Sequence, residues 1–272
     1  MTDVRMIEAL PMFAVIAGAW VRSGLTYRTS FVVMTLAGMV LTFLDFVIIL
    51  VMFSHLDALG GFTLAQIAVL YGMSGLAIGV ADLLLGNAET LGQRVRDGSL
   101  DQMLIRPVPT LVQVAADRFA LRRLGRVVQA TAVLGWGLAS APVDWSPLRV
   151  LVLVAAAVSG ALIFASVFVM GGAFQVFAGD ASEVANAFTY GGNTLTQYPL
   201  TIYPLEVVRA VTFVVPLAFV NWYPALYVLG VDDPFALPAV FQVASPVVAA
   251  LFVGVAALTW RGALRHYRST GS

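Results

Sequence analysis

Long apolar runs alternate with short polar segments along most of this 272-residue chain. A helix that crosses a bilayer needs about 20 consecutive, mostly apolar residues. Five runs meet this length, and a sixth, residues 124–142, is shorter and begins with arginines that can extend to the interface. The pattern predicts an all-α integral membrane protein with six transmembrane helices. The five long runs are residues 30–53, 62–86, 148–177, 205–229 and 239–260.

The N-terminal segment differs from these runs. Its apolar stretch, residues 9–21, has only thirteen residues and contains Pro11, so it is too short to span a bilayer comfortably. We expect residues 1–29 to form an interfacial helix along the inner leaflet, with Arg22 and Arg28 among the lipid headgroups. A cleaved signal peptide is the alternative, but the acidic residues ahead of the apolar stretch outnumber its single arginine.

Composition agrees with a membrane protein and limits its chemistry. Hydrophobic residues make up 60% and charged residues 11% of the chain, against about 45–50% and 25% in soluble domains. Cysteine is absent, which excludes disulfides and thiolate metal sites. His55 and His266 lie near opposite interfaces, so we expect no metal site. All 15 basic side chains are arginine, and without the lysine of a Walker A loop the chain cannot be a conventional P-loop ATPase.

The distribution of arginine predicts the orientation. The loops at residues 55–61, 141–147 and 230–238 contain none, and Arg149 follows just beyond the second. If both termini are cytosolic, these loops lie outside and the other arginines lie inside or at inner helix ends, as the positive-inside rule requires. The arginines assigned to the inside are Arg5, Arg22, Arg28, Arg94, Arg96, Arg106, Arg118, Arg122, Arg123, Arg126, Arg209, Arg261, Arg265 and Arg268.

Residues 87–109 are the one markedly polar island in the first half of the chain, between the second and third predicted spans. We expect two short helices here. Leu91 and Val95 are four residues apart and share one face of the first helix, while Arg94 and Arg96 lie off that face. Gly98 ends this helix. The island is therefore predicted to be a compact cytosolic lever.

The second short helix is predicted to begin at a capping box formed by Ser99 and Gln102. It would present apolar side chains to a partner's groove, and the prolines from Pro107 onward would end it. A solvated interhelical loop is the alternative interpretation. The residues expected to contact the partner are Arg94, Arg96, Gly98, Ser99, Leu100, Asp101, Met103, Leu104, Arg106 and Pro107.

Two acidic residues lie more than one residue inside a predicted span. Asp45 is near the middle of the first, where a charged carboxylate costs at least about 2.5 kcal/mol. It is a candidate for a translocation path, and a hydrogen-bonded structural carboxyl is the alternative. Asp82 lies nearer the inner face, where we expect it to pair with an inner arginine.

A second polar segment, residues 179–204, joins the fourth and fifth predicted spans on the inner side. Pro199 and Pro204 with flanking tyrosines predict an interfacial elbow, because tyrosine favours the headgroup level and proline turns the chain. A second contact with a cytosolic partner is left open.

The sequence of the polar island resembles a segment of ABC-2 type permeases. Its Gly-x-Leu-Asp-x-x-Leu-x-Arg-Pro pattern is similar to that between the second and third spans of the bacterial six-span subfamily. Residues 197–204 and 212–225 agree with the same family, and the resemblance covers most of the chain. It implies an ABC-2, or type V exporter-like, fold in one transmembrane domain, residues 1–272. The pattern here is Gly98, Leu100, Asp101, Leu104, Arg106 and Pro107.

The resemblance also implies a function. The chain would be a non-catalytic permease subunit in the bacterial cytoplasmic (inner) membrane, with residues 87–109 as the coupling helix seated on an ABC ATPase subunit. ATP and Mg would bind that partner and not this chain. A second permease, identical or homologous, would complete the transporter, with export as the expected direction and no nucleic acid involved. The alternatives are a proton-coupled secondary transporter using Asp45 and Asp82, and a membrane scaffold.

Overall fold

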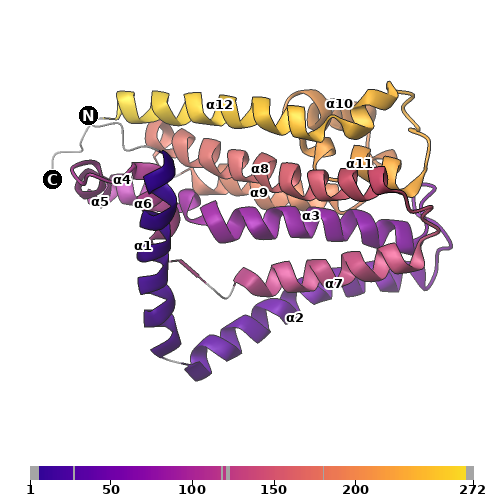
Figure 1. The fold of residues 1–272 in the computed structure, drawn as a ribbon, viewed down its shortest axis with the longest axis horizontal. Helices are drawn as coiled ribbons and strands as arrows, with labels where there is room; N and C mark the ends of the chain where they lie inside the picture. Colours follow the sequence, from indigo (N-terminus) through magenta and orange to yellow (C-terminus); the bar gives the residue numbers. More distant parts are fainter. Residues whose placement is uncertain (1–5, 27, 118, 121–122, 180, 268–272) are drawn as a thin grey trace.

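The computed structural model describes residues 6–26, 28–117, 119–120, 123–179 and 181–267. Within these residues the chain is almost entirely helical, with one isolated β-bridge between Leu59 and Phe62. Six helices run side by side along the long axis of the molecule (Figure 1). They are α2 (Arg28–Phe53), α3 (Leu64–Leu85), α7 (Leu124–Ser140), α8 (Pro147–Ala178), α9 (Ser182–Thr196) and α12 (Ser245–His266).

The remaining elements gather at the two ends of this bundle (Figure 1). One end, which we name the α5 end, carries α1 (Met6–Thr26), η1 (Gly86–Thr90), α4 (Leu91–Arg96), α5 (Ser99–Leu104) and α6 (Thr110–Ala116). The opposite α11 end carries α10 (Leu205–Phe213), η4 (Leu217–Phe219), α11 (Trp222–Leu229) and η5 (Ala239–Val243). The loops predicted to lie outside are all at the α11 end, whereas residues 87–109 are at the α5 end.

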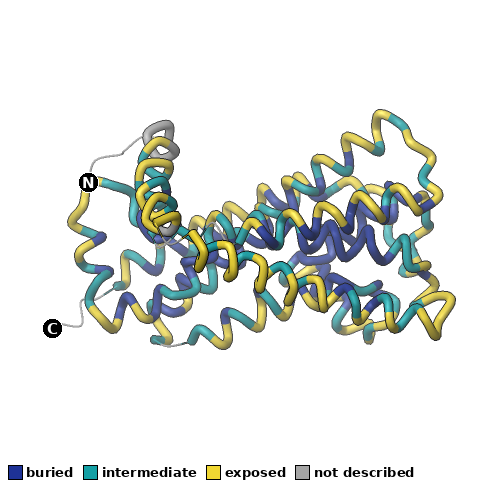
Figure 2. The backbone as a smooth tube through the Cα atoms, turned by 90° about the horizontal axis from the view of Figure 1, so that it is seen from below, coloured by how far each residue is buried: buried dark blue, intermediate teal, exposed yellow. Residues whose placement is uncertain are grey.

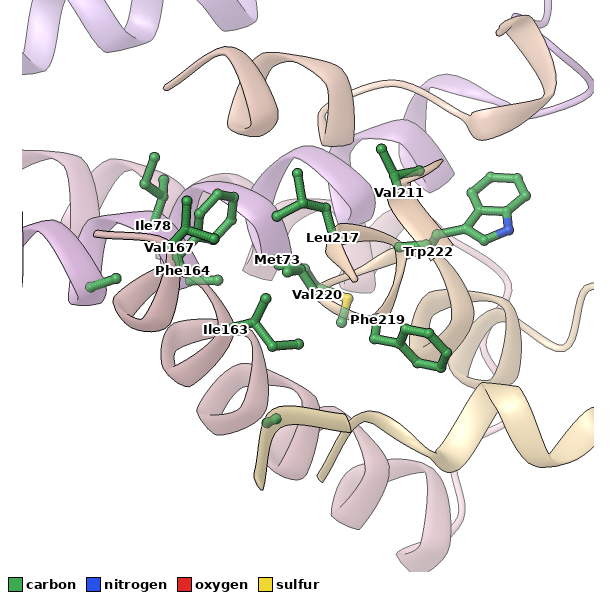
Figure 3. Packing of buried hydrophobic residues seen from close by; sticks show 14 of the residues in the cluster. Met73, Ile78, Ile163, Phe164, Val167, Val211, Leu217, Phe219, Val220 and Trp222 are labelled. Atoms are coloured by element: carbon green, nitrogen blue, oxygen red, sulfur yellow. The ribbon is translucent and has the colours of Figure 1, made fainter. Parts of the chain in front are cut away.

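Helix α3 lies at the centre of the bundle and is buried on all sides (Figures 1 and 2). Small residues let its neighbours approach closely. A Cβ added at Gly72 would lie 2.6 Å from the Cα of Leu134 on α7, and one at Gly160 on α8 would lie 3.0 Å from the Cβ of Ala77. Figure 3 shows the apolar packing of α3 and α8 with the chain before α11. The labelled residues include Met73, Ile78, Ile163, Phe164, Val167, Leu217 and Val220.

The expected six spans are confirmed only in part. In the described residues four helices, α2, α3, α8 and α12, are long and apolar enough to cross a membrane, or five elements if residues 205–229 count as one bent span. Helix α7 has 17 residues, a length of about 26 Å. The last helix begins at Ser245, because residues 239–243 form a 3-10 turn.

Residues 205–229 do not form the continuous helix that their hydropathy predicts. The chain bends by 76° between α10 and the segment that leads into α11. Pro216 lies at this break, where proline interrupts the helical hydrogen bonding. Both pieces pack at the α11 end, where Thr212 Oγ1 lies 3.0 Å from the Tyr223 hydroxyl.

Residues 179–204 were expected to form an inner loop, and instead contain α9. This helix begins at the α5 end, and the chain that follows it reaches the α11 end, where Thr201 Oγ1 donates to the carbonyl of Gly60 at 2.7 Å. The proline-flanked turn therefore lies at the α11 end. Arg209, which follows it, belongs to that end and not to the inner group. Arg5, Arg118, Arg122 and Arg268 lie outside the described residues.

The predicted N-terminal helix is present as α1, which lies crosswise to the six long helices (Figure 1). It packs on α6, and the ring of Phe13 meets that of Phe119 edge-on at 5.9 Å. Val15 is 70% exposed on the other side of the helix. An apolar face is therefore available to a lipid surface, as an interfacial helix requires.

The close approach of α3 and α7 makes a testable prediction. Gly72→Ala should lower the thermal denaturation midpoint in detergent, because the new methyl group would push against the backbone of Leu134 and overpacking typically costs about 1–3 kcal/mol. Gly135→Ala is the matched control, since a Cβ at Gly135 on α7 meets nothing within 4 Å. Equal midpoints for the two variants would contradict the packing.

Candidate functional site

The polar island folds into the two short helices that the sequence predicts, α4 and α5. Gly98 separates them in the left-handed conformation, at φ +70°. The predicted capping box is not formed, because Ser99 is already the first helical residue. Instead Asp97 Oδ1 accepts hydrogen bonds from the Ser99 amide at 2.9 Å and from its hydroxyl at 2.6 Å.

The apolar side chains of α4 and α5 face the protein interior. Leu91 and Val95 are buried, as their spacing predicts. Leu100 and Met103 are buried as well, at 0% and 8% exposure, and Leu104 is half-buried. The expectation that Leu100 and Met103 project toward a partner is therefore wrong, whereas that for the half-buried Leu104 stays a prediction. They hold the short helices against the bundle.

Helix α6, which the sequence did not reveal, is the support for this loop. Gln113 Nε2 donates to the carbonyls of Met103 and Val108, both at 2.8 Å, and so fixes the end of α5. Asn87 Nδ2 donates to the carbonyls of Ala115 and Asp117 at 3.1 and 2.6 Å. Both amides are buried, so they hold the loop at its two ends.

Two further contacts fix α4. The guanidinium of Arg94 pairs with the carboxylate of Asp117 at 2.5 Å, and its side chain is only 9% exposed. This arginine was expected to lie off the apolar face of the helix and to contact a partner, whereas the structure buries it. The amide of Gly92 donates to Gln175 Oε1 on α8 at 3.0 Å. Helix α4 is thus fastened to α6 by an ion pair and to α8 by a hydrogen bond.

Four residues at the end of α5 form what we name the distal surface: Gln102, Ile105, Arg106 and Pro107. All four are exposed, and Ile105 has 84% of its surface accessible. Arg96 is exposed nearby on α4. An exposed isoleucine beside a cation on a rigid support is a suitable docking point for another protein.

The C-terminal end of α12 reaches the same loop. Tyr267 follows α12 directly and packs against the hydrophobic core. Burial and the neighbouring Asp101 carboxylate raise the pKa of the Tyr267 phenol above its usual value. Asp101, half-buried on α5, therefore faces the bundle and not a partner.

A cluster of charged side chains lies where the loop joins α3, and we name it the charged joint. Asp82 Oδ1 lies 3.3 Å from Arg123 Nε and accepts from the Tyr190 hydroxyl at 3.3 Å, while Asp82 Oδ2 lies 4.0 Å from Arg126 Nη1. The Arg126 guanidinium also lies 5.4 Å from the centre of the Tyr190 ring. Glu89 in η1 interacts with the same groups. The prediction that Asp82 pairs with an inner arginine is confirmed.

Asp45 is placed differently. It lies on an exposed part of α2 and makes no hydrogen bond or ion pair with any described residue. The structure therefore does not supply the structural hydrogen bond that was the alternative to a path residue.

A family model described as ABC-2 family transporter protein matches residues 39–271. The chain belongs to the ABC-2 transporter family. The match covers α3 to α12 and most of α2, including both short helices of the loop. Searches of curated proteins and of solved structures give no match.

Several residues that shape this ABC-2 loop were missed from the sequence. Asn87, Gln113, Asp117 and Gln175 all bond to the loop from positions that no motif marks. One sequence feature could have found the two glutamines: each is the single amide within an apolar stretch. A buried amide in such a stretch must find a backbone partner.

The Arg94–Asp117 ion pair predicts how the loop responds to its loss. Arg94→Gln should speed tryptic cleavage after Arg96 by roughly tenfold, because the half-buried Asp117 carboxylate loses its partner and an unpaired acceptor costs about 1–3 kcal/mol. Gln93→Ala, an exposed change on the same helix, should leave the rate unchanged. Exchanging the charges, with Arg94→Asp and Asp117→Arg together, should restore part of the resistance. Unchanged cleavage in the single variant would contradict this role.

The charged joint gives a second prediction for this ABC-2 protein. Asp82→Asn should lower stability by about 3 kcal/mol, because two arginines then lose the carboxylate that compensates them. Thermal denaturation in detergent measures the change. Glu183→Gln, an exposed acidic position at the start of α9, should have no effect. An equal loss of stability in both variants would contradict a stabilising role for the ion pairs of Asp82.

Proposed function

We propose that this chain is the permease subunit of an ABC exporter, driven by a separate ATPase subunit that binds the distal surface. The family match supports the permease assignment. The observation that carries the docking proposal is the exposure of Ile105 and Arg106 at the end of a loop whose other aliphatic residues are buried or half-buried. ATP and Mg bind the partner chain, which supplies the P-loop lysine that this sequence lacks.

A displacement of the distal surface is transmitted to the bundle through hydrogen bonds and an ion pair of the loop. Gln113 ties the end of α5 to α6, Arg94 ties α4 to Asp117, and Gly92 ties α4 to α8. Beyond them the charged joint connects the root of the loop to α7 and α9. ATP binding by the partner then needs only to favour one of two arrangements of these helices.

We assign the α5 end to the cytosol. Nine of the described arginines lie at or toward this end, against Arg149 and Arg209 at the α11 end, which is the positive-inside bias. The six long helices then cross the bacterial cytoplasmic membrane, with α9 as the fifth crossing and both termini in the cytosol. The nine are Arg22, Arg28, Arg94, Arg96, Arg106, Arg123, Arg126, Arg261 and Arg265.

A second permease, identical or homologous, completes the transporter in this proposal. Helix α2 is the most lipid-accessible of the long apolar helices, with only 11% of its apolar window buried. Val33, Leu41 and Ile48 are each more than half exposed along it. This face is available both to lipid and to a second permease.

A proton-coupled secondary transporter using Asp45 and Asp82 is less well supported. Asp82 already interacts with Arg123, Arg126 and Tyr190 of the same chain, so its contacts are explained by a structural role. That leaves Asp45 alone, whereas such carriers bind their coupling ions where several groups converge.

The docking proposal is tested by changing the distal surface. Ile105→Asp and Arg106→Glu should reduce co-purification of the ATPase at least about tenfold, because exposed anchor residues of this kind typically contribute 2 kcal/mol or more. Both variants should still insert and fold, since neither side chain is buried. ATP-dependent transport should fall with co-purification.

The matched control is Leu56→Asp, which places the same charge on an exposed leucine in the loop at the α11 end. It should leave ATPase binding intact. Full ATPase binding by Ile105→Asp and Arg106→Glu would refute the distal surface as the docking site. Transport by the purified chain alone in a proton gradient would refute the ABC assignment of its energy source.

A further inference from the structure

Glu89 lies in the charged joint by its position along the chain. Residues 64–96 form one helical run of 33 residues, made of α3, η1 and α4. Glu89 follows Asp82 by seven residues, or about two turns, so the two side chains lie on the same side of this run. The Arg123 guanidinium lies on that side as well, because a Cβ added at Gly86 would be 2.9 Å from its Nη1 atom.

The charged joint contains two carboxyl and two guanidinium groups, but their contacts are shared unequally. Asp82 takes the contacts of both arginines and of the Tyr190 hydroxyl. Glu89 forms no ion pair with a described residue, and its Oε2 atom is buried without a hydrogen-bond partner among them. Arg126 Nη1 is likewise buried and donates no hydrogen bond within the described residues. One acceptor and one donor of opposite charge are therefore left unused in the same cluster.

The surroundings of Glu89 favour its protonated form. A buried carboxylate without a partner is costly, whereas a protonated carboxyl carries no charge and can donate as well as accept. Glu89 lies in η1, outside the six long helices. Burial, and after it the carboxylate of Asp82, raises the pKa of Glu89 above its usual value. The two arginines and the Tyr190 hydroxyl act in the opposite direction and offset this only in part.

The other elements packed on η1 add no charge that would reverse this. Helix α8 presents Gly172 to the carbonyl of Ala88, and its one charged residue, Arg149, is at the opposite end of the helix. On the side of α4 and α6, Arg94 and Asp117 pair with each other. The charged groups that face Glu89 are therefore those of the charged joint.

We propose that Glu89 binds a proton in the conformation described here, and releases it when movement of residues 87–109 brings its carboxylate to Nη1 of Arg126. The O–H bond of the carboxyl group breaks, the proton passes to cytosolic water, and the new ion pair stabilises the second arrangement of the joint. Rising pH then favours the second arrangement, and acid favours the present one. The inference rests on the proposed permease function and adds its regulation by cytosolic pH.

This proton is not a transported ion. The charged joint lies at the root of the loop at the α5 end, which the proposed orientation places in the cytosol. The proton is therefore taken from the cytosol and returned to it. ATP binding by the partner subunit remains the energy source, and the protonation of Glu89 sets how readily the loop follows it.

Infrared spectroscopy of the purified chain in lipid nanodiscs tests the bound proton without any ATPase. The spectrum of the unchanged chain minus that of Glu89→Gln should contain the C=O band of a protonated carboxyl at neutral pH, and should lose it at alkaline pH. Glutamine has nearly the shape of the protonated acid, so this variant should fold. Glu183→Gln, an exposed position on α9, is the matched control and should give no such band.

Thermal denaturation gives an independent measurement on the same samples. Because the pKa of Glu89 is raised in the folded chain, the stability that the bound proton contributes is present below the pKa of the unfolded chain and is lost as pH rises through that of the folded chain. The midpoint of Glu89→Gln minus that of the unchanged chain should therefore increase with pH. Glu89→Asp, which keeps a titrating carboxyl, should retain a pH dependence that Glu89→Gln lacks. For Glu183→Gln the difference from the unchanged chain should stay constant.

The exchange of the proton for Arg126 is tested in the complex with the ATPase. Spectra of the unchanged complex minus the Glu89→Gln complex cancel the bands of the partner. A non-hydrolysable ATP analogue should abolish the carboxyl band at neutral pH, because Glu89 then pairs with Arg126. In an Arg126→Gln background, with and without Glu89→Gln, the band should persist after the analogue is added.

The absence of a Glu89 carboxyl band at neutral pH, a midpoint difference that does not change with pH, or a band that the ATP analogue leaves unchanged would each overturn the proposal. The permease function would survive these results if the ATPase still co-purifies with the chain and Ile105→Asp still abolishes that association. Conversely, a protonated Glu89 in a chain that binds no ATPase would leave the proton site standing and refute the proposed energy source.

Discussion

The backbone of α3 is in contact with α7 and α8 through glycine and alanine, and the other elements are arranged around this contact. In a bilayer, helices gain little from leaving lipid, so close van der Waals packing must hold them together. Gly72 and Gly137 permit that packing with α7, and Gly160 permits it with α8. The three helices therefore form one closely packed block. Because α3 continues through η1 into α4, the loop is attached to this block directly.

The loop at residues 87–109 uses most of its apolar side chains to pack on the block. Leu100 and Met103 are buried within the chain, and Gln113 fixes the backbone between them and the prolines. Only a small apolar surface around Ile105 stays exposed, beside the charge of Arg106. The proposed docking surface is therefore small and rests on a loop that several buried contacts hold in place.

Hydropathy predicted α2, α3 and α8 closely, and Gly98 and the prolines gave correct limits for the short helices. Hydropathy failed for α9 and for residues 205–229, because an average over a window shows neither which side of a helix each residue occupies nor where the chain bends. In α9 the polar residues Thr189 and Asn193 face inward while Phe188 is exposed, so a helix of low mean hydropathy still presents an apolar face to lipid. The prediction that Leu100 and Met103 face a partner failed for the same reason. Spacing showed which side chains share a face, but α6, which covers that face, has no marked periodicity in seven residues.

Helix α9 is held by close packing and also by polar contacts. A Cβ at Gly171 on α8 would lie 2.9 Å from the Cβ of Ala185 on α9. Helix α9 joins its neighbours through hydrogen bonds: Ser74 on α3 donates to Asn193 at 2.9 Å, and Asn221 before α11 donates to the carbonyls of Thr196 and Leu70. Such bonds contribute only about 0.6 kcal/mol each on average within membranes. Replacing these hydrogen bonds by others costs little free energy, whereas separating α3 from α7 would open a void along their whole contact. The charged joint also links α9 to the root of the loop at residues 87–109 through Tyr190. The loop and α9 therefore share one set of polar contacts, whereas α3 and α7 are joined by backbone packing.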